Sequence, residues 1–200
     1  MVELDDKTLA DRIGDGDVHA FQTFVDTYKK KVYCLSYDIL GNHPDSEDIS
    51  QEVFIKVYRS IHLFRRDAKM SSWLYQITVN TCIDLLRKKS TKKQDSIETI
   101  GEVDIRQQAW GMKPNDEPEL HGDAAILQAR IKTALDRLSA KERTVFVMKL
   151  YNGFKIKEIA EILDVTAGTV KSLLFRAVKK LQKELVGYSK TLRLGGVAHE

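Results

Sequence analysis

Residues 155–183 read KIKEIAEILDVTAGTVKSLLFRAVKKLQK, and they contain two helical patterns that meet at a tight joint. Apolar residues recur every three or four positions over residues 156–163 and again over 170–181, which is the period of an α-helix. Thr166 can cap the second helix, and Asp164 suits the turn because Asp tolerates a left-handed backbone. The segment therefore predicts a helix-turn-helix.

The outer face of the second predicted helix is polar and basic. Its side chains are Thr169, Lys171, Ser172, Phe175, Arg176, Lys179 and Lys180. Cations can contact phosphates, hydroxyl groups can bond to base edges, and an aromatic ring can contact the methyl group of thymine. Two interpretations fit these residues: a helix that binds DNA, or an ordinary helical hairpin whose charged face is only solvated.

Composition indicates a globular protein of one or two small domains. The 200 residues are 42% apolar and 30% charged, which excludes disorder throughout the chain. The net charge is only +3, but it is distributed unevenly. Residues 123–186 carry 13 Lys and Arg against 7 Asp and Glu, whereas residues 91–122 carry 4 against 7. The positive charge thus accompanies the predicted helix-turn-helix, where a phosphate backbone would attract it.

No membrane or targeting segment is expected. No apolar run approaches the roughly 18 residues that cross a bilayer, and the acidic start (Glu3, Asp5, Asp6) is unlike a signal peptide. We therefore expect a cytoplasmic protein without membrane insertion. Cys34 and Cys82 are too few for a set of metal ligands, so they are predicted to be buried, reduced thiols, with a redox switch between them as the alternative.

The first part of the chain predicts a bundle of helices. Residues 8–40 have helical spacing with a break at Gly-Asp-Gly-Asp, and residues 41–44 end the second helix. The next helix is expected to open near Asp45 and to run to Ile61.

The predicted helix from Asp45 to Ile61 is apolar on two faces. One stripe consists of Ile49, Val53, Val57 and Ile61, and a second patch consists of Phe54, Ile55 and Tyr58. Such a helix either meets a partner or lies deep in a core. Its third face is charged, which favours the partner.

A basic loop and a helix with a mixed polar face follow. The loop over residues 64–71 contains three basic residues, and Ser71 or Ser72 can cap a helix that runs to about Lys89. Trp73, Gln76, Asn80 and Arg87 share one side of that helix. These residue types suit contact with unstacked bases, but a solvated polar face with one tryptophan at its edge fits equally well.

The helical period is lost over residues 91–122, where Gly, Pro and acidic residues predict a flexible linker. A second domain is expected over residues 123–186, with a capping box at 139–142. Lys155 stands where a Ser or Thr cap is expected, which opposes the helix dipole unless a phosphate lies nearby. Residues 187–200 form a tail without a clear pattern. The prediction is an all-α protein of two small helical bundles joined by a flexible linker, the C-terminal one containing the helix-turn-helix.

Five segments, taken together and in order, resemble a known family. They are GDGDVHAFQTFVDTY, DSEDISQEVFIKVYRSI, SSWLYQITVNTCIDLLRK, LSAKERTVFVMKLYNGFKIKEIAEIL and GTVKSLLFRAVKKL. The chain is similar to the extracytoplasmic-function (ECF) sigma factors of the sigma-70 family, which direct bacterial RNA polymerase to promoters. The resemblance implies that residues 1–90 are sigma region 2, which binds core polymerase and recognises and melts the -10 element. It implies that residues 123–186 are sigma region 4, which recognises the -35 element.

The resemblance also implies roles for single residues. The candidates for binding core polymerase, at its β′ clamp region, are Asp45, Asp48, Gln51, Phe54 and Lys56. The candidates for binding the melted -10 strand are Phe64, Arg65, Lys69, Trp73, Gln76, Asn80 and Arg87. The candidates for the -35 element are Lys155, Thr169, Lys171, Ser172, Phe175, Arg176 and Lys179. Leu173 departs from the pattern, because family members often carry Arg there, and it is either a core residue or a contact for a thymine methyl group.

The resemblance implies an initiation factor that is not an enzyme, needs no cofactor, and has core polymerase, promoter DNA and an anti-sigma factor as partners. The residues themselves give no support for an enzyme, because the five His are scattered and no phosphate loop or nucleophile motif occurs. The alternative function is a conventional helix-turn-helix regulator whose N-terminal domain senses a ligand or dimerises.

Overall fold

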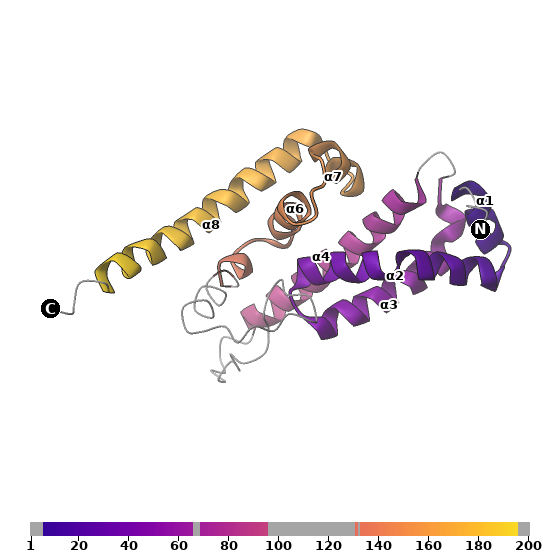
Figure 1. Ribbon diagram of the computed structural model, residues 1–200, viewed down its shortest axis with the longest axis horizontal. Coiled ribbons are helices and arrows are strands. Elements are labelled where there is room, and N and C mark those ends of the chain that lie inside the picture. The colour runs from indigo at the N-terminus through magenta and orange to yellow at the C-terminus, as the bar shows by residue number, and fades with distance from the viewer. Residues whose placement is uncertain (1–5, 66–68, 96–130, 132, 196–200) are drawn as a thin grey trace.

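The computed structural model describes residues 6–65, 69–95, 131 and 133–195, and every regular element in these ranges is a helix (Figure 1). The elements are α1 (Asp6–Gly14), α2 (Val18–Leu40), α3 (His43–Ser60), the 3-10 helix η1 (Ile61–Leu63), α4 (Met70–Asp95), α6 (Ala140–Leu150), α7 (Ile156–Ile162) and α8 (Ala167–Gly195). The predicted all-α class is confirmed. Helices α2, α3 and α4 pack together, and α6, α7 and α8 form a second group beside them.

Local hydrogen bonds set the boundary between α2 and α3. Gly41 ends α2 with a φ of 75° and donates its N–H to the Tyr37 carbonyl at 2.7 Å. Asn42 then caps α3, because its side-chain oxygen accepts the N–H of Asp45 at 3.0 Å. The helix therefore begins at His43, two residues before the predicted start.

The predicted stripe on α3 is the centre of the first bundle. Its members Ile49, Val53, Val57 and Ile61 are all buried, which confirms the prediction. They join buried apolar residues of α2 and α4, including Phe24, Val32, Leu35, Ile39, Leu74, Val79 and Ile83. Burial of each such side chain contributes about 1.5–3 kcal/mol, so this stripe accounts for how the three helices associate.

The two cysteines lie in different environments. Cys82 is buried on α4, and burial raises the pKa of its thiol to about 12. Cys34 is exposed on α2, so the prediction of two buried thiols is wrong for this residue. The neighbouring residue Leu35 lies on the buried face of α2, and Cys34 lies on the face open to solvent.

Two helices are longer than predicted. Helix α4 begins at Met70, before the expected caps Ser71 and Ser72, and it runs through Asp95, into the predicted linker. The rest of that linker lies outside the described residues. Helix α8 continues to Gly195, so the predicted tail is also partly helical.

The helix-turn-helix is confirmed in α7 and α8. Asp164 has a φ of 51°, the left-handed conformation that the turn requires. Thr166 caps α8, since its hydroxyl oxygen accepts the N–H of Thr169 at 3.1 Å. Leu173 is 6% exposed and lies with Val170 in the core. Of its two predicted roles, the structure therefore supports the core residue.

A capping box opens α6, as predicted. The Ser139 hydroxyl oxygen accepts the N–H of Glu142 at 3.3 Å, and the Glu142 carboxylate accepts the N–H of Ser139 at 3.0 Å. Glu142 is buried, and Lys180 of α8 donates to its carboxylate at 2.6 Å. This one side chain thus connects the start of α6 to α8.

Glu142 should make stability depend on pH. Burial raises the pKa of its carboxyl group, but hydrogen bonds from Lys180 and Ser139 outweigh burial and hold the pKa below the ordinary 4.5. Because the folded-state pKa is lowered, the stabilisation is complete above pH 4.5 and is lost as the pH falls through the folded-state value. The difference in unfolding free energy between wild type and Glu142→Gln should therefore shrink in acid, as urea titrations at stepwise lower pH would measure. A constant difference, or the same trend for the exposed Glu161→Gln control, would contradict this assignment.

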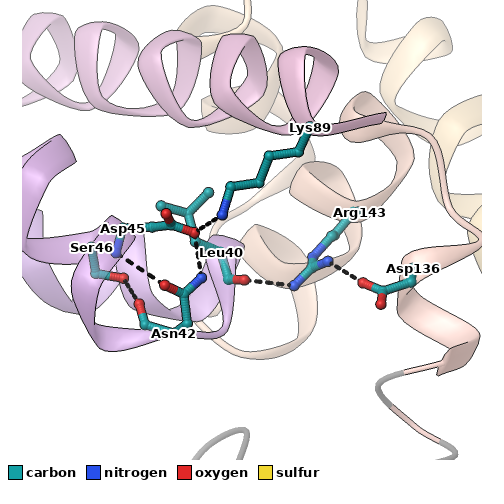
Figure 2. A network of polar contacts seen from close by, with 7 residues as sticks. All are labelled: Leu40, Asn42, Asp45, Ser46, Lys89, Asp136 and Arg143. Carbon is teal, nitrogen blue, oxygen red and sulfur yellow. Dashed lines mark hydrogen bonds and ion pairs between the residues drawn. The ribbon is translucent and has the colours of Figure 1, made fainter. Parts of the chain in front are cut away.

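Arg143 joins the two groups of helices (Figure 2). It is only 6% exposed, and it donates to the Leu40 carbonyl at the end of α2 at 3.0 Å. It also bonds to Asp136 at 3.0 Å. Burial lowers the pKa of Arg143, and the nearby Asp136 charge opposes that shift. The Arg143 guanidinium thus forms a buried hydrogen bond to Leu40, a residue 103 positions away in the sequence.

Two more contacts cross between the groups. Asn152 donates to the Asp38 carboxylate at 2.6 Å, and the rings of Tyr75 and Phe154 meet edge to face at 5.6 Å. Buried apolar residues of both groups belong to one cluster. In this structure the two predicted bundles therefore lie against each other.

Candidate polymerase and nucleic-acid interfaces

Asp45 lies in the first turn of α3, inside the polar network of Figure 2. Its carboxylate accepts a hydrogen bond from the Asn42 amide at 2.5 Å and forms an ion pair with Lys89 of α4. Its charge is therefore largely matched within the chain. Asp48 and Gln51 lie farther along α3 and are exposed to solvent.

The other two candidates on α3 are also engaged. Lys56 pairs with Glu52 at 2.7 Å and donates to the Thr81 hydroxyl at 3.1 Å. Phe54 is half-buried, with its ring edge-on to Phe24 at 6.2 Å. Among the five candidates, Asp48 and Gln51 are thus the side chains most open to a partner.

An apolar patch lies next to these residues. Ile55 and Tyr58 of α3 are about half exposed, and the Tyr58 ring lies 5.0 Å from the ring of Phe21. Val18, one turn before Phe21 on α2, is 69% exposed. The sequence predicted the α3 part of this patch but missed the α2 part, although Val18 and Phe21 have helical spacing. These side chains of α2 and α3 form the apolar part of the candidate polymerase surface.

Phe64 is the buried residue among the -10 candidates. It is 3% exposed, and its ring lies 5.3 Å from that of Trp73, which is half-buried. Phe64 is therefore a core residue that supports Trp73, and it does not present its own ring to solvent.

Five of the seven -10 candidates line one cleft of about 840 Å³: Phe64, Arg65, Lys69, Trp73 and Gln76. The opposite wall comes from the second group of helices, through Phe154, Glu158, Glu161 and Ile162. This acidic wall could not be predicted from local patterns, because it depends on how the two groups pack.

The remaining -10 candidates lie farther along α4. Asn80 is exposed and lines a hollow of about 420 Å³ together with Lys56 and Arg59 of α3. Arg87 pairs with Asp84 at 3.7 Å and faces a separate cavity between the two groups. The seven candidates therefore occupy three places and do not form one surface.

The -35 candidates on α8 are brought together. Lys171, Ser172, Phe175 and Arg176 are exposed and line one shallow hollow, and Lys179 is exposed one turn further on. Phe175 is 68% exposed, although a phenyl ring in water is costly. Thr169 is partly committed to the cap, since its hydroxyl lies 2.9 Å from that of Thr166.

Lys155 is exposed at the start of α7, where it precedes the first helical residue. Its backbone N–H donates to the Glu158 carboxylate at 2.7 Å. That carboxylate also places a negative charge at the helix start, which offsets the unfavourable lysine. The unusual cap is therefore compensated within the chain, without a phosphate.

Among the described residues, no helix is long and apolar enough to cross a membrane. Within the same part of the chain, no three His, Cys, Asp or Glu side chains gather as metal ligands would.

Comparison with known proteins identifies the family. Sigma-70 region 2 matches residues 24–92, and Sigma-70 region 4 matches residues 128–181. The ECF RNA polymerase sigma factor SigW of Bacillus subtilis is 36% identical over 187 residues, which cover 92% of this chain and 98% of SigW. The chain belongs to the ECF sigma factors. The ECF RNA polymerase sigma-E factor of Escherichia coli K12 is 30% identical over 92% of this sigma factor and 95% of its own length.

Solved structures show the same fold. CnrH, in complex with the cytosolic domain of CnrY, is 21% identical with a TM-score of 0.60, over 91% of this sigma factor and 97% of CnrH. The sigma factor RpoE of Bartonella quintana, in complex with the anti-sigma factor NepR, is 24% identical with a TM-score of 0.59, over 84% and 98% of the two chains.

Proposed function

We propose that this ECF sigma factor binds bacterial core RNA polymerase and directs it to promoters by two separate contacts with DNA. Helix α8 recognises the -35 element as duplex, and the loop before α4 together with α4 binds the -10 element as a melted strand. Helix α3 and the patch beside it bind the β′ clamp region of the polymerase. This function belongs in the cytoplasm and needs no catalytic group or cofactor, because binding energy alone holds the strands apart.

One observation carries the proposal: a single chain has side chains that suit nucleic acid on both sigma regions, on an exposed face of α8 and in a cleft beside α4. Phe175 is exposed between Ser172, Arg176 and Lys179 on α8, where a thymine methyl group could cover its ring. Trp73 and Gln76 line a cleft with Lys69 on the other region. Unstacking a base costs a few kcal/mol, and stacking on an aromatic ring returns about 1–3 kcal/mol per base.

The decisive experiment is run-off transcription by purified core polymerase with and without this protein on a set of genomic promoters. Defined transcripts that depend on the protein are expected. Failure to initiate at any defined site would overturn the proposal.

The alternative, a conventional regulator, is tested by gel filtration of the protein with core polymerase in the absence of DNA. A sigma factor should co-elute with core at a one-to-one ratio, whereas a regulator should not.

We further propose that an anti-sigma factor holds the protein inactive. The sigma factor RpoE of Bartonella quintana, which has the same fold and whose structure is a complex with the anti-sigma factor NepR, supports this part of the proposal.

Arg176→Ala should weaken binding to a -35 duplex by about 1–3 kcal/mol, because a guanidinium on an exposed helix face can bond to a base edge. Fluorescence anisotropy with a duplex from a promoter found by run-off transcription measures this loss. Lys183→Ala, which removes an exposed cation two turns further along α8, is the matched control and should have a smaller effect. An unchanged affinity for Arg176→Ala would remove this residue from the -35 contacts.

A further inference from the structure

Helix α4 is capped by a residue from the start of the chain. The Asp6 carboxylate, on the first residue of α1, accepts the N–H of Met70 at 2.8 Å. Met70 is the first residue of α4, 64 positions further along the chain. The residue before it, Lys69, has an ammonium group, which can only donate and so cannot cap a helix start.

This contact fixes the end of the loop that carries Arg65 and Lys69. Phe64 anchors the chain on one side of the loop, at 3% exposure, and Met70 anchors it on the other side, at 0%. The Lys69 carbonyl already accepts the N–H of Trp73 at 3.2 Å, so Lys69 is the last residue before the helix. The Asp6 bond therefore determines the direction in which the chain enters α4.

Helix α1 is itself packed into the bundle. Its residues Ala10 and Ile13 are 0% and 2% exposed, and the helix contacts η1, which directly precedes Phe64. A carboxylate at a helix start also matches the partial positive charge of the helix dipole. The acceptor thus belongs to a packed helix and carries the favourable charge.

We propose that Asp6 is a positioning residue for capture of the melted -10 strand. It does not touch DNA. It holds the Lys69–Met70 backbone so that Lys69 and Trp73 face the same cleft. The inference rests on the proposed function, since it assigns Asp6 to the segment that binds this strand.

The test compares Asp6→Ala and Asp6→Asn in complete holoenzyme. The probe is a fluorescent single-stranded oligonucleotide with the non-template -10 sequence of a promoter found by run-off transcription. Loss of a helix cap typically destabilises a helix start by about 1 kcal/mol, so Asp6→Ala, which removes the acceptor, should weaken binding of the strand by at most about fivefold. Asp6→Asn keeps a side-chain oxygen and should stay within about twofold of wild type, because Asn caps nearly as well as Asp. Asp15→Asn, an exposed carboxylate beyond the end of α1, should have no effect.

Core binding and binding of a -35 duplex are the discriminating measurements, and both should be unchanged in Asp6→Ala. Wild-type affinity for the strand, or a parallel loss of all three activities, would overturn the positioning role. Lack of rescue by Asp6→Asn would also overturn it. Failure of the wild-type protein to support any transcription would instead refute the proposed function.

Discussion

Replacing Trp73 by alanine should slow promoter opening by about 5- to 150-fold, because stacking of a base on an aromatic ring contributes about 1–3 kcal/mol. Trp73 is half-buried, lies on Phe64 and lines the cleft of the -10 candidates, so its ring is held in place before a base arrives. A fluorescent base at the -10 element reports the rate of opening. Asn80→Ala should act in the same direction, from its separate hollow on α4.

Trp73→Phe is the matched variant, since it keeps an aromatic face and should recover much of the rate. Binding of the Trp73 variants to core polymerase should stay within about twofold of wild type, because the proposed polymerase contact is on α3. If core binding falls as much as opening does, Trp73 is a structural residue and its assignment to the -10 strand is wrong.

Arg143→Ala should lower the free energy of unfolding by about 2–4 kcal/mol. The substitution leaves the buried Leu40 carbonyl without this donor, at about 1–3 kcal/mol, and it also removes the packing of a long side chain. Loss of the ion pair with Asp136 contributes less to the decrease in unfolding free energy, because the Asp136 side chain is 40% exposed and remains hydrated without its partner. Urea denaturation measures the change.

Lys141→Ala is the control for Arg143, since Lys141 is an exposed cation on the same helix. It should change stability by less than about 0.5 kcal/mol, as is usual for surface substitutions. Equal effects of the two substitutions would mean that the Arg143 bond to Leu40 contributes nothing.

The regular parts of the fold could be predicted because their patterns are local. The stripe from Ile49 to Ile61, the turn at Asp164 and the capping box at Ser139 each depend on residues a few positions apart. The start of α4 could not be predicted in this way, because its cap comes from Asp6. The exposure of Cys34 depends on which face of α2 the other helices cover, and a single helical pattern does not determine that face.

The candidate sites follow the same division. The exposed face of α8 was predicted, because Lys171, Arg176 and Lys179 lie opposite a regular apolar stripe. The burial of Phe64 was not predicted. This residue lies between two helices, where no helical period indicates which side chains point into the core. The acidic wall formed by Glu158 and Glu161 depends on contacts between two distant parts of the chain.

The packing of the two groups of helices has a consequence for how promoters are occupied. The -10 and -35 elements are named for positions about 25 base pairs apart, which is about 85 Å along B-form DNA at about 3.4 Å per pair. In this structure Lys69 of region 2 and Glu158 of region 4 line a single cleft, so the two regions lie side by side. If the proposed function is correct, the two groups of helices must separate, each remaining folded, before the protein can span a promoter. The hydrogen bonds of Arg143 and Asn152 between the two groups then oppose this separation. Because these bonds must break, the net affinity for promoter DNA is lower.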